Sequence, residues 1–286
     1  MEQATTTEHI SNGKSPEAQQ AHEPTIIREP RVYLVGRQVM DREAVDEFLD
    51  EYGMTWETDT EVGGEQMVEA AGRICYLSFG KGRKTNKEYV ENLMSMKHGS
   101  VLEHAVWDLV IAGVSRSFSH ELVRHRAGFG YSQLSQRYVD ESMANFVEPE
   151  IIVRDPQMHE VWLKSVKASH AAYVELVEGM MAVAEERAAA SGEKVNKTHL
   201  RKQVREAARS VLPNATETMI FVSANARALR HFIELRGSEG ADAEIRRVAV
   251  KVLRIMQTEA PTLFADYVIE TLPDGGEVAR TAWEKV

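Results

Sequence analysis

The chain has 286 residues, of which 43% are hydrophobic, and a formal net charge of -10. This length and apolar content suffice for a sizeable core in one large domain or two small ones. The acidic balance argues against general nucleic-acid binding, which uses a strongly basic face. No apolar run approaches the roughly 20 residues that span a bilayer. We therefore expect neither nucleic acid nor a membrane among its partners.

The cysteine content limits the covalent links and metal sites that the chain can form. Cys75 is the only cysteine, so the chain can form neither an intrachain disulfide nor a cysteine-built metal site. The first residues lack the basic-then-apolar pattern of a signal peptide. Together these features predict a cytoplasmic protein. Cys75 lies between Ile74 and Tyr76 in an apolar helical patch, and we expect it to be a buried structural thiol.

In the first third of the chain, the residue pattern predicts a tail, a strand and three helices. Residues 1–30 are polar and are expected to form a disordered tail. Residues 31–40 read as a strand, and a helix capped by Asp41 and ended by Gly53 follows. A second helix is predicted over 64–79. Its apolar face should be formed by Met67, Ala70, Ala71 and Ile74. A third helix is predicted over 86–99, with Asn86 as its cap and Gly99 as its stop.

The remaining elements alternate between strands and long helices. Residues 104–117 predict a strand rich in valine and isoleucine. Asp155 and Pro156 predict the start of a long helix that runs to about residue 190 and that Gly179 could interrupt. The later elements are a helix over 198–212, a strand over 216–224, and helices over 226–236 and 241–260. We predict an α+β fold with a small antiparallel sheet surrounded by long helices.

Positive charge is concentrated in RHRAGFGYSQLSQRY, residues 124–138. Its basic side chains would repel one another unless an anion lay among them. Arginine suits phosphate because its planar fork donates two hydrogen bonds, and Ser132 and Ser135 add hydroxyl donors. The segment 131–137 is expected to be a polar loop that binds a nucleotide phosphate and sugar. An internal ion-pair hub for the 44 carboxylates is an equal alternative.

Other basic and aromatic residues receive simpler interpretations. Arg201, Arg205 and Arg209 lie along one helical stripe. Arg201 and Lys202 should face solvent, whereas Arg209, next to apolar residues and just before Pro213, indicates a function. No metal site is expected from the histidines. Surface positions are predicted for His159, His170 and His199, and core or interface positions for Trp107 and Trp162.

Several ordered motifs resemble those of flavin-dependent thymidylate synthases. That family typically shows RHR, seven residues, then Ser followed by x-R-Y; here eight residues separate Arg126 from Ser135. Four further patches resemble the family in the expected order: AGRICY (71–76), HGSVLEH (98–104), RSVLP (209–213) and NARALRHFIELR (225–236). Together they cover most of residues 65–260. The resemblance implies a single catalytic domain over 31–270 and a C-terminal tail over 271–286.

The resemblance also implies the chemistry and the site. The family reduces FAD with NADPH, takes one carbon from methylenetetrahydrofolate and converts dUMP to dTMP in a homotetramer with active sites between subunits. By position, the cofactor-binding residues would be His98, Ser100, Arg124, His125, Arg126, Gln133, Asn225, Arg227 and His231. The dUMP-binding residues would be Glu121, Arg124, Gln133, Leu134, Ser135, Gln136, Arg137, Arg209 and Arg236.

The implied roles agree with physical chemistry. Uracil C5 becomes a better nucleophile when negative charge on the ring is stabilised, and the resemblance gives this catalytic role to Arg236. No protein nucleophile is needed, so Ser135 is assigned to phosphate binding. Two residues depart from the family pattern: Glu121 stands where glutamine is frequent, and His231 stands where an amide is frequent.

Two alternatives remain at this point. Glu121 and the longer loop would also fit flavin- and folate-dependent hydroxymethylation of dUMP or dCMP. The same arginines would also fit a non-catalytic nucleotide- or nucleic-acid-binding protein, which would be colourless and would bind oligonucleotides in a salt-dependent way.

Overall fold

The computed structural model describes residues 23–192, 194 and 196–286. Its centre is a four-stranded sheet in which every pair of neighbours is antiparallel, as predicted. The strand order is β2 (Arg31–Arg37), β3 (Val106–Ser115), β6 (Glu217–Asn225) and β4 (Phe129–Gln133). The three strands predicted from β-branched and apolar runs are β2, β3 and β6, and all three are confirmed.

Strand β4 was not predicted. Residues 131–137 were expected to be a loop, but Tyr131, Ser132 and Gln133 pair with β6. The strand is polar and contains Gly130, so its own sequence gives a weak strand signal. Pairing with β6, which lies more than 80 residues away in the chain, supplies the order that the local sequence does not indicate.

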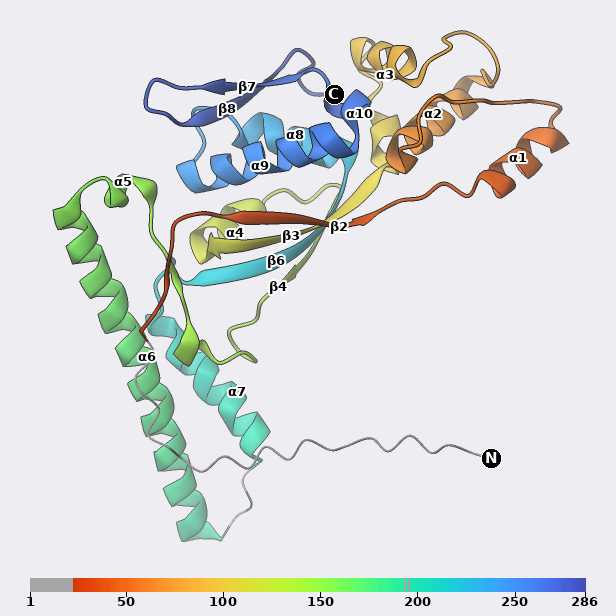
Figure 1. The fold of residues 1–286 in the computed structure, drawn as a ribbon. Coiled ribbons are helices and arrows are strands. Elements are labelled where there is room, and N and C mark those ends of the chain that lie inside the picture. The colour runs from red at the N-terminus through yellow and green to blue at the C-terminus, as the bar shows by residue number, and fades with distance from the viewer. Residues whose placement is uncertain (1–22, 193, 195) are drawn as a thin grey trace, which may run out of the picture.

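Helices cover one face of the sheet (Figure 1). They are α4 (Arg116–Leu122), α8 (Ala226–Arg236) and α9 (Ala243–Glu259). Strand positions that alternate with period two point toward these helices, and Trp107, Leu109 and Val222 are each 1% exposed in the resulting core. The predicted burial of Trp107 is confirmed. Helices α8 and α9 also match their predicted ranges.

A helical region precedes β3. It contains α1 (Arg42–Glu51), α2 (Gly63–Tyr76), α3 (Asn86–Ser95) and the short 3₁₀ helix η1 (Gly99–His104). Asp41 accepts a hydrogen bond from the amide of Ala44, and Gly53 has φ +62°, so the predicted limits of α1 are confirmed. The predicted cap of α3 is wrong, because Thr85 caps it. Helix α3 also ends at Ser95, before the predicted stop.

The predicted buried face of α2 is also wrong. The buried residues of this helix are Gly64, Glu65, Gln66, Val68, Glu69, Gly72 and Arg73. Polar side chains take the inner face because Glu65, Glu69 and Arg73 find partners there. Ile74 is therefore exposed, and Cys75 is exposed instead of buried.

Two long helices extend away from the sheet as an arm (Figure 1). They are α6 (Pro156–Ser191) and α7 (Lys197–Ala208), followed by the 3₁₀ turn η3 (Arg209–Val211). Asp155 caps α6 and Pro156 begins it, as predicted, and the helix runs through Gly179 without interruption. His170 is buried at 6% exposure, which corrects its predicted surface position.

Both predicted tails contain ordered structure. Residues 1–22 of the predicted N-terminal tail lie outside the described residues. Residues 26–27 form β1 (Ile26–Ile27), which pairs in parallel with β5 (Phe146–Val147). In the chain order, β5 lies between η2 (Glu141–Met143) and α5 (Glu150–Val153).

At the other end, β7 (Tyr267–Thr271) pairs with β8 (Glu277–Thr281) after α10 (Pro261–Phe264). Val278 and Val286 are buried, so the predicted tail over 271–286 is wrong. Among the described residues, none of the helices has the length and apolar character needed to cross a membrane.

Candidate active site

The centre of the candidate site is a contact between two motifs that are far apart in the chain. Arg236, the last residue of α8, donates from Nε to Nε2 of His125 at 3.0 Å. Its Nη1 atom lies 2.8 Å from Oε2 of Glu121 on α4. The structure therefore brings together the residue predicted to be catalytic, the middle residue of the RHR triplet, and the glutamate that departs from the family pattern.

His125 is held in an apolar, cationic pocket. Its ring centroid lies 5.4 Å from that of Phe232, 6.0 Å from that of Phe129 and 5.9 Å from that of His231. Burial, and then the charges of Arg236 and His231, lower the pKa of His125 from 6.5 to about 4. The imidazole is therefore neutral at pH 7, and its Nε2 accepts the hydrogen bond that orients Arg236.

This low pKa predicts a pH dependence of stability. Between pH 4 and 6.5 the unfolded chain binds a proton at His125 that the folded chain does not bind. The stabilising contribution is thus fully present above pH 6.5 and is lost as the pH falls toward 4. Urea unfolding measures this effect. Between pH 7 and pH 4.5, we expect the free energy of unfolding of the wild type to fall by about 2 kcal/mol more than that of His125→Gln. Equal losses in the two proteins would contradict this assignment.

The first and last residues of the RHR triplet remain available to anions. Arg124 and Arg126 are exposed, and neither forms an ion pair with a described carboxylate. The Nε atom of Arg124 donates a hydrogen bond to the carbonyl oxygen of His120 at 3.2 Å. Glu121 pairs with Arg236 and not with Arg124. The ion-pair hub considered from sequence for residues 124–138 therefore describes Arg137, which pairs with Glu206, and it does not describe the two outer arginines of the triplet.

The segment that leaves β4 is fixed by contacts with α4 and β6. The amide nitrogen of Gln133 donates to Oγ of Ser119 at 2.9 Å and to Oγ1 of Thr218 at 3.3 Å. Neither bond uses the amide oxygen of Gln133. The backbone amide of Arg137 donates to Oγ of Ser135 at 3.4 Å, which places both residues in one tight turn.

Arg116 is a basic residue of this region that the sequence analysis missed. Its Nη1 atom donates to the carbonyl oxygen of Leu134 at 3.2 Å. Burial lowers the pKa of Arg116, and the nearby charge of Arg209 lowers it further, against an opposing effect of Glu141. Arg116 of α4 thus contacts the segment, and Arg209 of η3 lies near Arg116. The available signal was an arginine directly after a long apolar strand, a position that the motif comparison did not cover.

Gln136 is more deeply buried than expected for a loop, and the side chain of Arg137 is partly buried. Gln136 is 8% exposed, and Nη2 of Arg137 lies 2.8 Å from Oε2 of Glu206 on α7. The Nε atom of Arg137 is buried and has no hydrogen-bond partner among the described residues. A cavity of about 520 Å³ adjoins it, lined by Arg137, His199, Lys202, Gln203, Glu206 and Ala207. A phosphate oxygen is the kind of acceptor that would satisfy this nitrogen.

A separate group of predicted residues lies at the other end of α8. Nη1 of Arg227 contacts Oε1 of Glu103 at 2.6 Å, and Oδ1 of Asn225 accepts from the amide of Ala228, which caps the helix. His98 stacks with Tyr76 at a ring-centroid distance of 6.3 Å. The ten residue steps from Ala226 to Arg236 correspond to about 15 Å along the helix axis, so one chain does not bring this group into contact with Arg236.

Gly128 connects this group to the RHR loop. It has φ +73°, and a Cβ atom there would lie 2.6 Å from Nδ2 of Asn225. Only glycine therefore permits this approach of the loop to the start of α8. Ser100 in η1 and His231 in the middle of α8 are both exposed.

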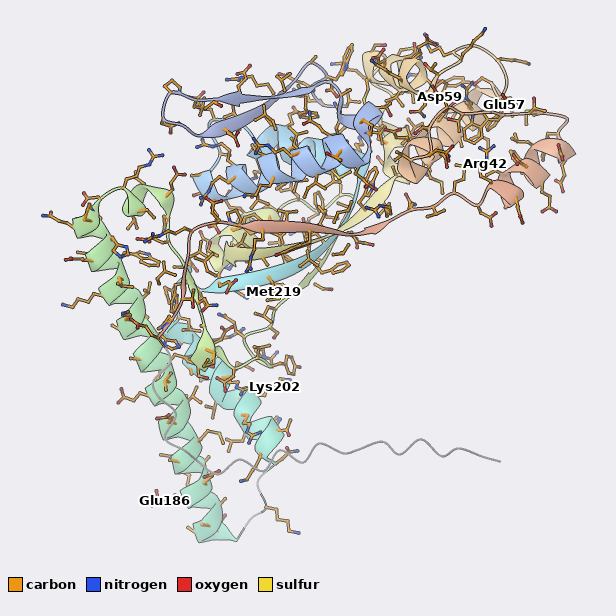
Figure 2. The ribbon with its side chains drawn as sticks, in the orientation of Figure 1. Arg42, Glu57, Asp59, Glu186, Lys202 and Met219 are labelled. Carbon is orange, nitrogen blue, oxygen red and sulfur yellow. The ribbon has the colours of Figure 1, made fainter. Side chains whose placement is uncertain are left out.

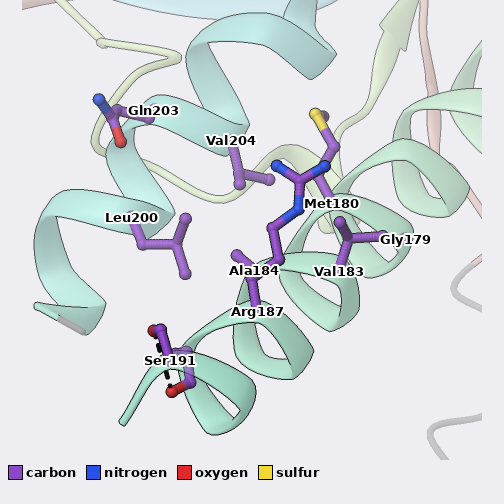
Figure 3. A pocket seen from close by; sticks show the side chains of 10 residues that line it. Gly179, Met180, Val183, Ala184, Arg187, Ser191, Leu200, Gln203 and Val204 are labelled. Atoms are coloured by element: carbon purple, nitrogen blue, oxygen red, sulfur yellow. Dashed lines mark hydrogen bonds between the residues drawn. The ribbon is translucent and has the colours of Figure 1, made fainter. Parts of the chain in front are cut away.

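Two further features lie apart from this region. A cavity of about 680 Å³ separates α6 from α7 and is mostly apolar, with Met180, Val183, Leu200 and Val204 in its lining (Figure 3). It contains none of the predicted site residues. Within the described part of the chain, no group of three or more histidine, cysteine, aspartate or glutamate side chains is arranged to hold a metal ion.

Fold and site together define an α+β protein in which arginines from separate motifs lie near a neutral imidazole. Residues 58–262 match the family model described as thymidylate synthase complementing protein. Flavin-dependent thymidylate synthases from Mycobacterium marinum and Mycobacteroides abscessus are 48% and 47% identical over 241 and 239 residues, which cover 83% and 82% of this chain and 93% and 92% of the relatives. The enzyme of the same name from Corynebacterium glutamicum is 44% identical over 243 residues, 84% of this chain and 94% of its own length. The chain belongs to the flavin-dependent thymidylate synthase family.

Proposed function

We propose that the protein converts dUMP to dTMP in a flavin-dependent reductive methylation. The hydrogen at uracil C5 is replaced by a methyl group. Its carbon comes from methylenetetrahydrofolate, which leaves as tetrahydrofolate, and NADPH supplies the two electrons and becomes NADP⁺. The family membership supports the overall reaction. The residue roles below, the folate and NADPH, and a cytoplasmic location are parts of the proposal.

The observation that carries the proposal is the fixed orientation of Arg236. Glu121 and the neutral His125 each contact its guanidinium, which keeps it at the C-terminal end of α8. A guanidinium held in advance stabilises negative charge that develops on the uracil ring, and this increases the nucleophilicity of C5. Because His125 is uncharged, Arg236 supplies the positive charge of this contact.

The phosphate of dUMP fits the arginines around the segment after β4. Arg209 and Arg137 would bind its oxygens, Ser135 would add a hydroxyl, and Arg116 would position the segment through the carbonyl of Leu134. The partnerless Nε of Arg137 supports this assignment. Gln133 and Gln136 would complete the nucleotide pocket from the same segment.

The residues predicted to hold FAD have a suitable chemistry. Arg124 and Arg126 are cations without a described carboxylate partner, which suits the diphosphate of FAD. His98, Ser100, Asn225 and Arg227 would form the remaining contacts. When bound, the flavin supplies hydride transfer. Since one chain does not bring His98, Asn225 and Arg227 into contact with Arg236, we propose a homotetramer in which adjacent subunits complete each site.

Tritium release from dUMP labelled at C5 tests this function. We expect release from the purified protein only when FAD, NADPH and methylenetetrahydrofolate are all present. Each omission in turn serves as the control. Protein that binds FAD but releases no tritium from dUMP would refute the proposed substrate. Colourless protein that binds oligonucleotides would favour the non-catalytic alternative.

A substitution at Arg209 tests the phosphate assignment. Arg209→Ala removes a charge-assisted contact worth about 1.5–3 kcal/mol, so we expect the KM for dUMP to rise by about 10–100-fold. The value of kcat should change little, because the phosphate is bound equally before and during the reaction. Arg201→Ala is the matched control, since Arg201 is exposed on the preceding turns of α7. An equal effect of both substitutions would contradict the assignment.

A further inference from the structure

A cavity of about 490 Å³ lies beside α9, outside the candidate active site. Its other walls are the turn of the β7–β8 hairpin, the residues that follow β1, and the residues around α5 (Figure 1). This volume is in the range of small-molecule sites. The cavity is separate from the one beside Arg137, whose lining residue Lys202 lies on the arm (Figure 2). None of its lining residues is assigned to FAD or dUMP.

Basic side chains from two adjacent rows of α9 form one wall of this cavity. The first row contains Arg246, Val250 and Arg254, and the second contains Arg247 and Lys251. Residues four apart lie on the same side of a helix, and like charges in such positions repel one another. This concentration of cations stands out in a chain whose net charge is -10. The wall therefore requires anions to neutralise it.

Two carboxylates of the chain contact three of these cations. Glu29 is shared between Arg247, at 3.5 Å, and Lys251, at 3.4 Å, and the side chain of Glu29 is 69% exposed. Glu277 contacts Arg254, and both side chains are more than one third exposed. Exposed ion pairs of this kind are weak. A ligand with a higher negative charge can therefore take the place of Glu29.

The other two carboxylates in the lining are paired away from α9. Glu148 is fully buried and contacts Arg28 and His159, and Glu150 contacts Arg154. In the described chain, neither carboxylate forms an ion pair with a cation of α9. These pairs therefore leave the charge of the helix face unchanged.

Arg246 and Arg247 have hydrogen-bonding capacity that the described chain does not use. The Nε atoms of both are buried and have no hydrogen-bond partner among the described residues. Arg246 also has no carboxylate partner in those ranges, and its Nη1 atom donates to the carbonyl oxygen of Glu239 at 3.1 Å. Gly276 in the hairpin turn leaves room beside this guanidinium, because a Cβ atom there would lie 3.2 Å from Nη2. Guanidinium groups with unused N–H donors suit phosphate oxygens.

We propose that this cavity binds the phosphate chain of a small-molecule polyphosphate through Arg246, Arg247 and Lys251. Eight residue steps separate Arg246 from Arg254, which corresponds to about 12 Å along the helix axis. A single phosphate does not meet cations spread over this length, whereas a chain of phosphates contacts several of them at once. The ligand displaces Glu29 from its two cations and supplies acceptors for the buried Nε atoms.

The site adjoins the turn between α8 and α9. Glu239, whose carbonyl oxygen accepts from Arg246, lies three residues after Arg236. A polyphosphate bound to Arg246 therefore contacts a residue that holds this turn, close in the chain to the proposed uracil site. The inference does not depend on the proposed function, because none of the residues that carry it is assigned to the reaction.

Isothermal titration calorimetry with sodium tripolyphosphate and the full-length protein tests the site. FAD and dUMP are present in excess, so that the arginines assigned to them are occupied. We expect saturable binding, and we expect Arg246→Gln to weaken it by more than about tenfold because a charge-assisted contact is lost. Arg280→Gln is the matched control, since Arg280 is about half exposed on β8 and pairs with Glu270. A wild type without saturable binding, or equal affinities of the two variants, would overturn the proposal.

Removal of the competing carboxylate should have the opposite effect. Glu29→Gln leaves Arg247 and Lys251 without their partner. We therefore expect tripolyphosphate to bind at least about threefold more tightly to this variant than to the wild type. A purely structural role of Glu29 does not predict tighter binding. Unchanged or weaker binding would count against the proposed displacement and overturn it.

Acetylation of lysines in the wild-type protein locates the ligand without any substitution. The side chain of Lys251 is 37% exposed, and that of Lys87 on α3 is 67% exposed. With acetic anhydride as the reagent, we expect saturating tripolyphosphate to slow acetylation of Lys251 by more than about threefold and to leave Lys87 unchanged. Peptide mass spectrometry measures both rates. Equal rates at Lys251 with and without tripolyphosphate would overturn the proposal.

Further probes identify the source of the phosphate chain. Inorganic phosphate should bind at least about tenfold more weakly than tripolyphosphate, and equal affinities would overturn a site for a phosphate chain. ATP that binds more tightly than tripolyphosphate would identify a nucleotide as the ligand, whereas an equal or lower affinity would identify an inorganic polyphosphate. None of these measurements involves turnover. Binding at the cavity without tritium release from dUMP would leave the site intact and refute the reaction alone.

Discussion

Replacing Arg236 with alanine is expected to lower kcat/KM for dTMP formation by about 10²–10³-fold, which is the cost of removing one preorganised donor from a developing anion. Arg236 is suited to this role because two fixed partners orient it, His125 at 3.0 Å and Glu121 at 2.8 Å. Both kcat and kcat/KM should fall, since the charge on the ring develops only during the reaction. Arg236→Lys should recover little, because a lysine cannot reproduce the planar fork.

The matched control for this substitution is Arg280→Ala. Arg280 lies on β8, where it pairs with Glu270 and both side chains are about half exposed. Its removal should leave tritium release at the wild-type rate. Arg236→Ala with wild-type kcat would show that another residue stabilises the uracil ring. A rise in KM alone would assign Arg236 to binding and not to catalysis.

Replacing Glu69 with alanine is expected to lower the free energy of unfolding by about 3–5 kcal/mol, the cost of leaving a buried charge without its partner. Glu69 is 1% exposed and accepts hydrogen bonds from Trp56, Arg73 and Asn86. Arg73 is itself 3% exposed and also donates to the carbonyl oxygens of the loop after α2. Loss of Glu69 therefore removes the hydrogen bonds that join α2 to Trp56, in the segment after α1, and to Asn86 of α3, and it leaves Arg73 without its carboxylate partner.

Urea unfolding at pH 7 measures this effect, with Glu91→Ala as the control. Glu91 also pairs with a cation one helical turn away, Lys87, but the distance is 3.9 Å and both side chains are more than half exposed. Its removal should cost no more than about 0.5 kcal/mol. Similar losses in the two variants would show that the buried network contributes no more than a surface pair.

Elements with strong local signals were predictable from the sequence. Strand β3 and helix α6 have apolar runs or caps that act within a few residues of the element, such as Asp155 before Pro156. Gly192 ends α6 at φ +70°, a conformation that glycine adopts without strain. In these cases the local preference and the final packing agree.

Elements that depend on distant partners were not predictable. Strand β1 has two residues and is fixed by β5, 120 residues later in the chain. Residues 271–286 were predicted to be a tail, because the burial of β8 comes from packing against α8 and α9, which the local sequence does not indicate. The exposed position of Cys75 follows from the polar inner face of α2, where Glu69 and Arg73 satisfy each other. Hydrophobicity alone places such a face on the outside.

The candidate site shows the same division. Motif resemblance identified Arg236, His125 and Glu121 separately. Their mutual contact joins residues 111 and 115 positions apart, and the neutral state of His125 follows from that packing. Arg116 was missed because it precedes the motif and reaches the segment only through folding.

Mass spectrometry of the nucleotide product tests the central claim most directly. Wild-type protein is incubated with dUMP, FAD, NADPH and methylenetetrahydrofolate that carries ¹³C in its methylene group. We expect dTMP with one ¹³C atom in its methyl group. A product heavier by one oxygen atom would identify a hydroxymethyl transfer, and dUMP recovered unchanged from protein that binds FAD would contradict the assignment of the substrate.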